Sequence, residues 1–270
     1  MFIILSGCSG VGKNTVIKEM QKSNEKLVLM PTYTTRDMRE GEANGKPYFY
    51  ITKEEFQDKI KNEELIEHEL IHNNFYGSSY ALFDEHIKGG NIIIKDIGVE
   101  GAQNLPLKLG DRTKIVKVFL TVEKKNELKK RLKARGEKQI KLRLKRYKYE
   151  QKQKNKFDYI ILNNNLDNTV DIMNDIINLQ TQDFYFEKDM PKYNPYKVKY
   201  FINKLQTNVV LSPVQIVVKN GKAYVVKGTE KLIASFMSGK SVAKQVVQKN
   251  KNFDKFVYGF YNRNKWKKFF

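Results

Sequence analysis

Apolar residues in this chain gather into short runs, and the segments between the runs alternate apolar and polar positions with a helical period. The segment 48–51 reads as a strand, and further short, mainly apolar runs lie at 2–5, 27–30, 91–97, 115–122 and 159–162. Short runs of this kind are typical of strands that are buried on both faces of a parallel sheet. Segments 15–23 and 53–62 have the spacing of amphipathic helices. The pattern predicts an α/β fold with a doubly wound, mainly parallel sheet that binds ligands at the carboxyl ends of its strands.

The first apolar run leads directly into a glycine-rich turn and then into a helical segment. The turn reads Gly7-Cys8-Ser9-Gly10-Val11-Gly12-Lys13-Asn14-Thr15. Such a turn directs several backbone N–H groups and a helix N-terminus toward one point, which suits a phosphate group. Its spacing fits the P-loop pattern G-x-x-x-x-G-K-[ST], except that Asn14 replaces the hydroxyl residue that usually contacts magnesium. We therefore expect an ATP site formed by Gly7, Ser9, Gly10, Val11, Gly12, Lys13, Asn14 and Thr15, with Lys13 bridging the outer phosphates.

Composition and charge indicate the cellular location of the protein and the kind of partner that it binds. The chain has 270 residues and a formal net charge of +20, and residues 181–270 carry 18 Lys and Arg against 5 Asp and Glu. This concentration of positive charge points to a polyanion, such as a nucleic acid, as a partner of the C-terminal part. No apolar run is long enough to cross a bilayer, and the apolar start is too short for a signal peptide, so we expect a cytoplasmic protein without membrane contact.

Two arginines and several aromatic residues follow the predicted phosphate loop. Arg36 and Arg39 are three residues apart, in a pattern that suits the bidentate grip of arginine on a phosphate. A second phosphate site beside a P-loop indicates a phosphoryl acceptor. The stretch 34–48, together with Leu65-Ile66-Glu67 and Phe75-Tyr76-Gly77-Ser78, resembles the guanylate kinase family, which carries T-T-R-x-x-R-x-G-E-x-x-G-x-x-Y, I-E and Y-G-[ST] in this order. The resemblance spans about residues 1–180. Its last matching motif, at 158–166, resembles the family's closing strand and loop.

The resemblance to guanylate kinases implies a role for each matching residue of the acceptor site. The acceptor monophosphate would be held by Arg36, Arg39, Tyr48 and Tyr76. Glu67 would accept hydrogen bonds from the guanine ring, and the Ser78 hydroxyl would meet its carbonyl oxygen. Thr32 lies where the family often has a serine. ATP would be the donor, and GMP or dGMP the acceptor.

The resemblance also implies a lid and a magnesium ion. Arg131, Arg135 and Arg143 match the lid arginines of the family, and with Lys13 they would neutralise charge on the transferring phosphoryl group. Mg²⁺ would be bound by the amide oxygen of Asn14 and, through water, by Asp96, because this ion prefers oxygen ligands. The fold implied is a P-loop kinase with lid and monophosphate-binding insertions.

Three departures from the family pattern bear on activity. The family's D-x-D reads Asp96-Ile97-Gly98 here, so the carboxylate that usually contacts the guanine amino group is missing and base selectivity changes. Asn14 removes the usual magnesium hydroxyl, which we expect to reduce activity without abolishing it. The segment between Gly136 and Arg143 is a few residues shorter than the family's lid, which would alter lid closure or the size of the acceptor.

The chain divides into a P-loop kinase domain at 1–183, a linker at 184–200 and a small basic α+β domain at 201–270. In the small domain, apolar runs at 214–218 and 223–226 flank Asn220-Gly221, a turn pair typical of a β-hairpin, and a helix is expected at 230–237. This region resembles the ParB and sulfiredoxin fold, with Lys231 at the position of that family's arginine. The basic aromatic tail, 249–270, either binds nucleic acid through phosphate contacts and base stacking or packs the small domain.

Three functional hypotheses follow. The first is a nucleoside monophosphate kinase acting on GMP or dGMP, which the acceptor grip favours. The second is a DNA or RNA kinase that accepts a modified nucleotide on the same core, which Gly98 and the altered lid favour. The third is a catalytically impaired guanylate-kinase-like binding module, which Asn14 and Gly98 favour but the retained Lys13 and lid arginines oppose.

Overall fold

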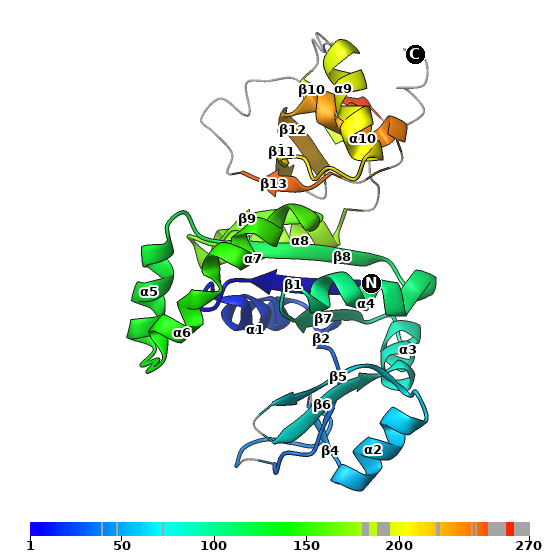
Figure 1. Ribbon diagram of the computed structural model, residues 1–270, viewed down its shortest axis with the longest axis vertical. Helices are drawn as coiled ribbons and strands as arrows, with labels where there is room; N and C mark the ends of the chain where they lie inside the picture. The colour runs from blue at the N-terminus through cyan, green and yellow to red at the C-terminus, as the bar shows by residue number, and fades with distance from the viewer. Residues whose placement is uncertain are drawn as a thin grey trace. The chain divides into compact units, whose positions relative to one another are not determined.

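The computed structural model describes residues 1–38, 40–46, 48–71, 73–179, 184–187, 195–219, 222–238, 240, 242–247 and 258–261. Contacts divide the chain into two compact units. The first unit comprises 1–6 and 17–117, and the second comprises 7–16 and 118–270. Strand β1 (Phe2–Gly7), helix α1 (Lys13–Ser23) and strand β8 (Ile115–Thr121), which Figure 1 labels, each have residues in both units.

The first unit contains a parallel run of strands and a separate small sheet. Strands β1, β7 and β2 pair in parallel, with Phe2 opposite Ile93 and Leu27 opposite Ile92. Residues 2–5 are fully buried, as the continuous apolar run predicts. The remaining elements of this unit are β2 (Leu27–Leu29), β3 (Thr32–Thr34), β4 (Tyr48–Tyr50), α2 (Lys53–Lys61), β5 (Leu65–Ile71), β6 (Asn74–Ser79), α3 (Tyr80–Lys88), β7 (Ile92–Asp96), α4 (Gly101–Leu109) and η1 (Gly110–Arg112).

The small sheet has the strand order β4-β3-β6-β5. Strand β3 pairs in parallel with β4 and antiparallel with β6, and β5 pairs antiparallel with β6. Helix α2 starts with a capping box, in which the Thr52 side chain accepts from Glu55 N and the Glu55 side chain accepts from Thr52 N. Its one buried side chain, Phe56, stacks on Phe75 of β6 with ring centroids 5.2 Å apart. This ring pair fixes the helix against the sheet that carries the predicted acceptor residues.

The second unit contains the glycine-rich turn, the predicted lid and the C-terminal part of the chain. Its strands run in the order β14-β10-β12-β11-β13-β9-β8. Besides the residues of α1 and β8, its elements are α5 (Lys125–Ala134), α6 (Ile140–Lys145), α7 (Tyr147–Gln153), η2 (Lys154–Lys156), β9 (Tyr159–Leu162), α8 (Leu166–Ile177), β10 (Phe184–Glu187), α9 (Pro195–Gln206), β11 (Val214–Lys219), β12 (Lys222–Lys227), α10 (Thr229–Ser238), β13 (Lys244–Val246) and β14 (Tyr258–Tyr261).

The C-terminal strands continue the sheet that contains β8 and β9. Strand β9 pairs in parallel with β13, which places Ile160 opposite Gln245, and β13 pairs in parallel with β11. Helix α8 contacts β11 as well. The expected hairpin is present as the antiparallel pair β11 and β12, although its Asn220-Gly221 turn lies outside the described residues. Where the sequence analysis expects a linker, at 184–200, the structure has β10 and the start of α9.

Most of the strands and helices expected from the apolar pattern are present within a residue or two of their predicted bounds. The basic stretch 123–156 is helical, as expected, but it divides into α5, α6, α7 and η2. Gly136, with a φ of 75°, directly follows the C-cap of α5 and ends that helix. Within the described part of the chain, every helix is too short or too polar to cross a bilayer.

Candidate functional site

The glycine-rich turn in the second unit has the backbone that its sequence predicts. Gly7, Gly10 and Gly12 have φ values of 144°, 85° and 102°, which side-chain-bearing residues rarely adopt. A Cβ on Gly12 would lie 2.8 Å from Asn163 Nδ2, so close packing also requires glycine there. Val11 N donates to Cys8 O at 3.1 Å, and Lys13 Nζ donates to Gly7 O at 3.0 Å. Asn14 and Thr15, in the first turn of α1, are exposed.

A buried amide and an arginine hold this turn through one carbonyl group. Asn163 Nδ2 donates to Val11 O at 2.7 Å, and Arg131 Nη1 donates to the same oxygen at 3.0 Å. Arg131 Nη2 also donates to Asn163 O at 2.7 Å, and Thr169 Oγ1 donates to Asn163 Oδ1 at 2.9 Å. Asn163 is only 6% exposed. The segment after β9 and helix α5 therefore fix the position of the predicted phosphate loop.

The two other predicted lid arginines meet at a carboxylate that sequence reasoning did not identify. Glu137 Oε2 lies 3.5 Å from Arg135 Nη2 and 3.3 Å from Arg143 Nε. Gln139 N donates to Glu137 Oε1 at 3.0 Å, and this hydrogen bond, together with the two arginines, lowers the pKa of Glu137. Both arginine side chains remain more than half exposed. The structure thus brings Arg135 and Arg143 together, while Arg131 contacts the phosphate loop.

Cys8 lies inside the predicted phosphate loop and is a buried thiol. Burial raises the pKa of Cys8 to about 12, and a hydrogen bond from Gln151 opposes that rise. Gln151 Nε2 lies 3.4 Å from Cys8 Sγ and donates to Thr121 Oγ1 at 3.0 Å. The thiol is therefore protonated at neutral pH and packs as a small apolar group.

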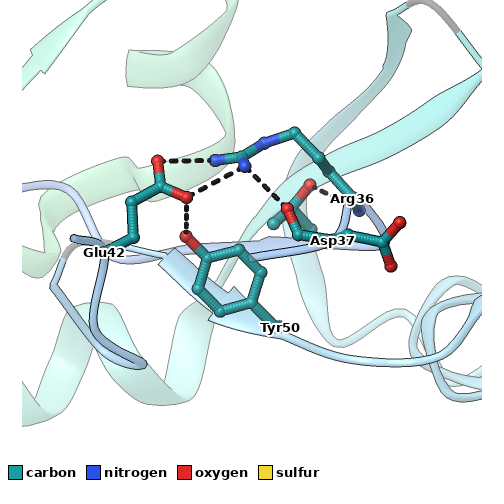
Figure 2. A network of polar contacts seen from close by, with 5 residues as sticks. Arg36, Asp37, Glu42 and Tyr50 are labelled. Carbon is teal, nitrogen blue, oxygen red and sulfur yellow. Dashed lines mark hydrogen bonds and ion pairs between the residues drawn. The ribbon is translucent and has the colours of Figure 1, made fainter. Parts of the chain in front are cut away.

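The predicted monophosphate residues lie on or beside the small sheet of the first unit. Arg36 follows β3, and its guanidinium donates to both carboxylate oxygens of Glu42 at 2.9 Å (Figure 2). Tyr50 OH donates to Glu42 Oε2 at 2.8 Å, and Arg36 Nη1 donates to Asp37 O at 2.7 Å. The hydrogen bond with Glu42 raises the pKa of Arg36, which stays charged. Arg36 is thus held in a fixed orientation before any phosphate binds.

Two neighbouring tyrosine rings contact this arginine. Arg36 Cζ lies 5.5 Å from the ring centroids of both Tyr48 and Tyr50. Tyr76 packs edge to face on Tyr48, with centroids 6.1 Å apart. The structure therefore brings Arg36, Tyr48 and Tyr76 together, as the resemblance implies. Arg39 lies outside the described residues.

The predicted base-contacting residues form a polar cluster on the same sheet. Glu67 of β5 is opposite Ser78 of β6 in the strand register. Ser78 is fully buried, and its Oγ lies 3.4 Å from Thr32 Oγ1. Lys95 of β7, a residue to which the sequence analysis assigns no role, donates to Glu67 Oε1 at 2.9 Å and to Ser78 Oγ at 3.2 Å.

The segment after β7 carries the departures from the family pattern. Asp96 ends β7 and is exposed. Gly98 is exposed and its backbone lies outside the positive-φ region. A Cβ at Gly98 would meet only the Glu100 carboxylate, whose Oε2 would be 3.6 Å away. The Cβ of the aspartate that the family pattern has would therefore fit at this position.

Three residues with well-defined contacts, Lys95, Glu137 and Asn163, have no role in the sequence analysis. Lys95 is a charged residue in an otherwise apolar strand, and this was the one available signal for it. Glu137 is an acid between two arginines within a basic stretch, so its sequence environment does not distinguish it from a surface charge. Asn163 follows the β9 strand within an Asn-rich segment, 163–165, in which nothing separates the loop-binding amide from its neighbours.

Comparisons with known proteins identify a family over most of the chain. A family model described as guanylate kinase matches residues 1–180. The guanylate kinase of Prochlorococcus marinus subsp. pastoris is 38% identical over 171 residues, which cover 62% of this chain and 91% of that protein. The guanylate kinase of Mesoplasma florum is 34% identical over 221 residues, which cover 77% of this chain and 73% of that protein. The crystal structure of guanylate kinase from Anaplasma phagocytophilum is similar over 67% of this chain and 86% of that one, with 26% identity and a TM-score of 0.49.

The Mesoplasma alignment covers more residues than the family match does, so it extends into the C-terminal part of this chain. The family match alone accounts for about two thirds of the sequence. The chain therefore belongs to the guanylate kinase family.

Proposed function

We propose that the small sheet of the first unit is the surface on which this guanylate kinase holds its acceptor nucleotide. As a member of its family, the chain phosphorylates GMP with ATP. In our proposal Arg36, Arg39, Tyr48 and Tyr76 bind the acceptor monophosphate, and Glu67 and Ser78 contact the guanine base near Thr32. The proposal includes dGMP as an acceptor, because none of these residues is assigned to the ribose 2′-hydroxyl.

The observation that carries this proposal is the pairing of Arg36 with Glu42. A guanidinium whose two terminal nitrogens bind one carboxylate, and which contacts two neighbouring tyrosine rings, has a fixed orientation. Fixing it beforehand reduces the side-chain entropy that is lost when a phosphate binds. Glu67 and Ser78 lie on neighbouring strands of the same sheet, so phosphate and base contacts come from one rigid element.

On the donor side, we propose that the phosphate loop binds ATP through Gly7, Ser9, Gly10, Val11, Gly12, Lys13, Asn14 and Thr15. Lys13, Arg131, Arg135 and Arg143 would stabilise the charge that spreads over the transferring phosphoryl group. Arg131 would do so from its present position against Val11 O, which links the lid helix to the loop. The acceptor phosphate is already an anion, so no general base is required.

The side chains assigned to Mg²⁺ fit an ion that arrives with ATP. Asn14 and Asp96 both offer oxygen ligands and both are exposed. Among the described residues there is no cluster of three His, Cys, Asp or Glu side chains that would hold a metal by itself. Mg²⁺ usually retains waters and takes its remaining ligands from nucleotide phosphates, where it neutralises the charge of the phosphoryl group. We assign Asn14 to direct contact and Asp96 to contact through water.

Release of ADP from MgATP in the presence of GMP, dGMP, AMP, UMP, CMP and short DNA tests the proposal. We expect turnover with GMP and dGMP, and an increase of about 10- to 100-fold in KM for GMP in Arg36→Ala, because a charge-assisted contact is lost. Arg112→Ala is the matched control, since Arg112 also pairs with a carboxylate, Asp84, and lies over the Tyr80 ring. An unchanged KM in Arg36→Ala would place the monophosphate elsewhere, and turnover with DNA alone would favour the strand kinase.

The nucleic-acid role of the C-terminal part and its resemblance to the ParB and sulfiredoxin fold rest on sequence alone. Part of the aromatic tail, 258–261, forms strand β14 and pairs with β10. We propose that the excess of Lys and Arg in this region binds a polyanion. A gel-shift titration with single-stranded DNA at low and moderate salt tests this, and failure to bind at low salt would exclude it.

A further inference from the structure

Lys95 lies at the centre of the polar cluster to which base recognition is assigned. It is the penultimate residue of β7, and its side chain is 14% exposed. Its ammonium donates to Glu67 Oε1 at 2.9 Å and to Ser78 Oγ at 3.2 Å. A lysine side chain costs free energy to bury unless its donors are used. Both partners used here are residues assigned to guanine.

The hydrogen bonds around Ser78 have a definite direction. Thr32 Oγ1 donates to Met30 O at 3.1 Å, so its single hydroxyl hydrogen is committed. The 3.4 Å contact between Thr32 and Ser78 then requires Ser78 to be the donor. Lys95 occupies an acceptor position of the Ser78 oxygen. The Ser78 hydrogen is therefore held only by a long contact, and a better acceptor would capture it.

We propose that Lys95 recognises the 6-oxo group of the acceptor purine and is a specificity-determining residue of this enzyme. The proposal rests on the roles proposed for Glu67 and Ser78. In guanine the N1–H donor and the O6 acceptor are adjacent on one edge of the ring. If Glu67 accepts from N1–H and Ser78 donates to O6, an ammonium bound to both side chains lies beside O6. Lys95 has a third N–H donor that no described residue accepts, and O6 is the acceptor for it.

The same charge discriminates against adenine. Adenine carries an amino donor where guanine carries O6, so an adenine base would turn its donor toward the N–H groups of Lys95. A site that leaves its own polar group unpaired with the wrong substrate rejects that substrate strongly. Gly98, by contrast, provides no carboxylate for the 2-amino group. Lys95 thus shifts base selection from the 2-position to the 6-position, and IMP, which keeps the 6-oxo group, becomes an acceptor.

The test compares Lys95→Met with wild type, using GMP and 6-thio-GMP as acceptors and kcat/KM as the readout. The two nucleotides share N1–H and the 2-amino group and differ only in the 6-position atom, and sulfur accepts hydrogen bonds weakly. Any change at Glu67 affects both nucleotides equally, so it cancels in their ratio. We expect the preference for GMP over 6-thio-GMP to fall by about tenfold in Lys95→Met, and the preference for GMP over AMP to fall by about 10- to 100-fold.

Two further variants make the result decisive. Lys59→Met removes another partly buried lysine of the same unit, which pairs with Glu64 at 2.9 Å, and we expect both preferences to remain at the wild-type values. Lys95→Arg keeps the charge and should retain most of the preference for GMP over AMP. If Lys95→Met does not fold, Lys95→Gln is measured in its place.

The outcomes separate this inference from the proposed base site. A wild-type enzyme that does not prefer GMP over AMP would overturn the roles of Glu67 and Ser78 as well. A wild-type enzyme that prefers GMP, with both ratios unchanged within twofold in folded Lys95→Met, would overturn the role of Lys95 alone. If activity falls by the same factor with all acceptors, Lys95 only maintains the structure of the cluster and does not select the base. This result would also overturn the inference.

Discussion

The hydrogen bonds of Asn163 allow a quantitative prediction for Asn163→Ala. This side chain links the phosphate loop to helix α8, since it donates to Val11 O at 2.7 Å and accepts from Thr169 Oγ1 at 2.9 Å. Neither partner is left unpaired by the substitution, because Val11 O still accepts from Arg131 and Thr169 Oγ1 still donates to Asn165 O. Since the single hydroxyl hydrogen of Thr169 is shared between Asn163 Oδ1 and Asn165 O, the loss is that of one ordinary hydrogen bond, to Val11 O, and of part of a shared one, with no additional cost for an unsatisfied group.

The hydrogen bond to Val11 O, the shared hydrogen bond from Thr169 and a small cavity together amount to about 2–3 kcal/mol of unfolding free energy. For a chain of this size each kcal/mol lowers the unfolding temperature by roughly 2–4 °C, so we expect a decrease of about 5–10 °C. Only Arg131 would then hold the Val11 carbonyl, and the loop amides would be less ordered. We expect KM for ATP to rise by about tenfold, which corresponds to about 1.4 kcal/mol of binding free energy, while KM for GMP stays unchanged.

Differential scanning calorimetry and initial-rate kinetics measure the two effects separately. Asn165→Ala is the matched control, because its side chain caps α8 by accepting from Asn168 N at 2.8 Å but has no hydrogen bond to the loop. Loss of this cap costs about 1 kcal/mol and should leave KM for ATP unchanged. Asn163 does not have this role if Asn163→Ala is no less stable than Asn165→Ala, or if KM for ATP is the same in both variants.

Two further substitutions and one labelling experiment have definite expected results. In Glu137→Gln the cations of Arg135 and Arg143 lose their shared carboxylate and repel each other, so we expect kcat to fall by about tenfold with little change in KM for GMP, and an unchanged kcat in steady-state assays would contradict this. Because the pKa of Cys8 is about 12, a thiol reagent at pH 8 should label the folded protein far more slowly than the unfolded one, and equal rates would show that the thiol is accessible and ionised. Gly98→Asp should fold normally and raise the preference for GMP over IMP by about tenfold, as a contact to the 2-amino group is restored, and an unchanged ratio of kcat/KM values would show that no contact forms.

Strands β1, β2, β7, β8 and β9 were predictable because their sequences are short and mainly apolar. Residues 2–5 and 159–162 are short apolar runs whose only low-energy placement is between two layers of helices. The small sheet, in contrast, was predicted only at β4. Strands β3, β5 and β6 are rich in polar residues, since several of their side chains form the proposed acceptor site instead of a core. A strand whose function requires polar residues loses the alternation that identifies it.

Contacts within the site were predictable where residue type and order carry the chemistry. Arg36, Tyr48 and Tyr76 were expected to meet, and the structure brings them together. Glu42 binds both terminal nitrogens of Arg36, and Arg131 binds the loop carbonyl instead of joining the other lid arginines; no motif in the sequence indicates either pairing. Such pairings depend on side-chain distances across elements far apart in the sequence, which no local pattern contains.

The C-terminal strands have a structural consequence for the kinase sheet that their charge does not reveal. Strand β9 would be an edge of the sheet in the second unit if β13 were absent, and exposed parallel edges promote pairing with other chains. Strand β13 covers that edge by pairing with β9, and β11, β12, β10 and β14 extend the sheet further. Part of the aromatic tail therefore already serves sheet formation through β14. A polyanion would then have to bind the exposed basic side chains of this region, so its binding should depend strongly on salt and weakly on base sequence.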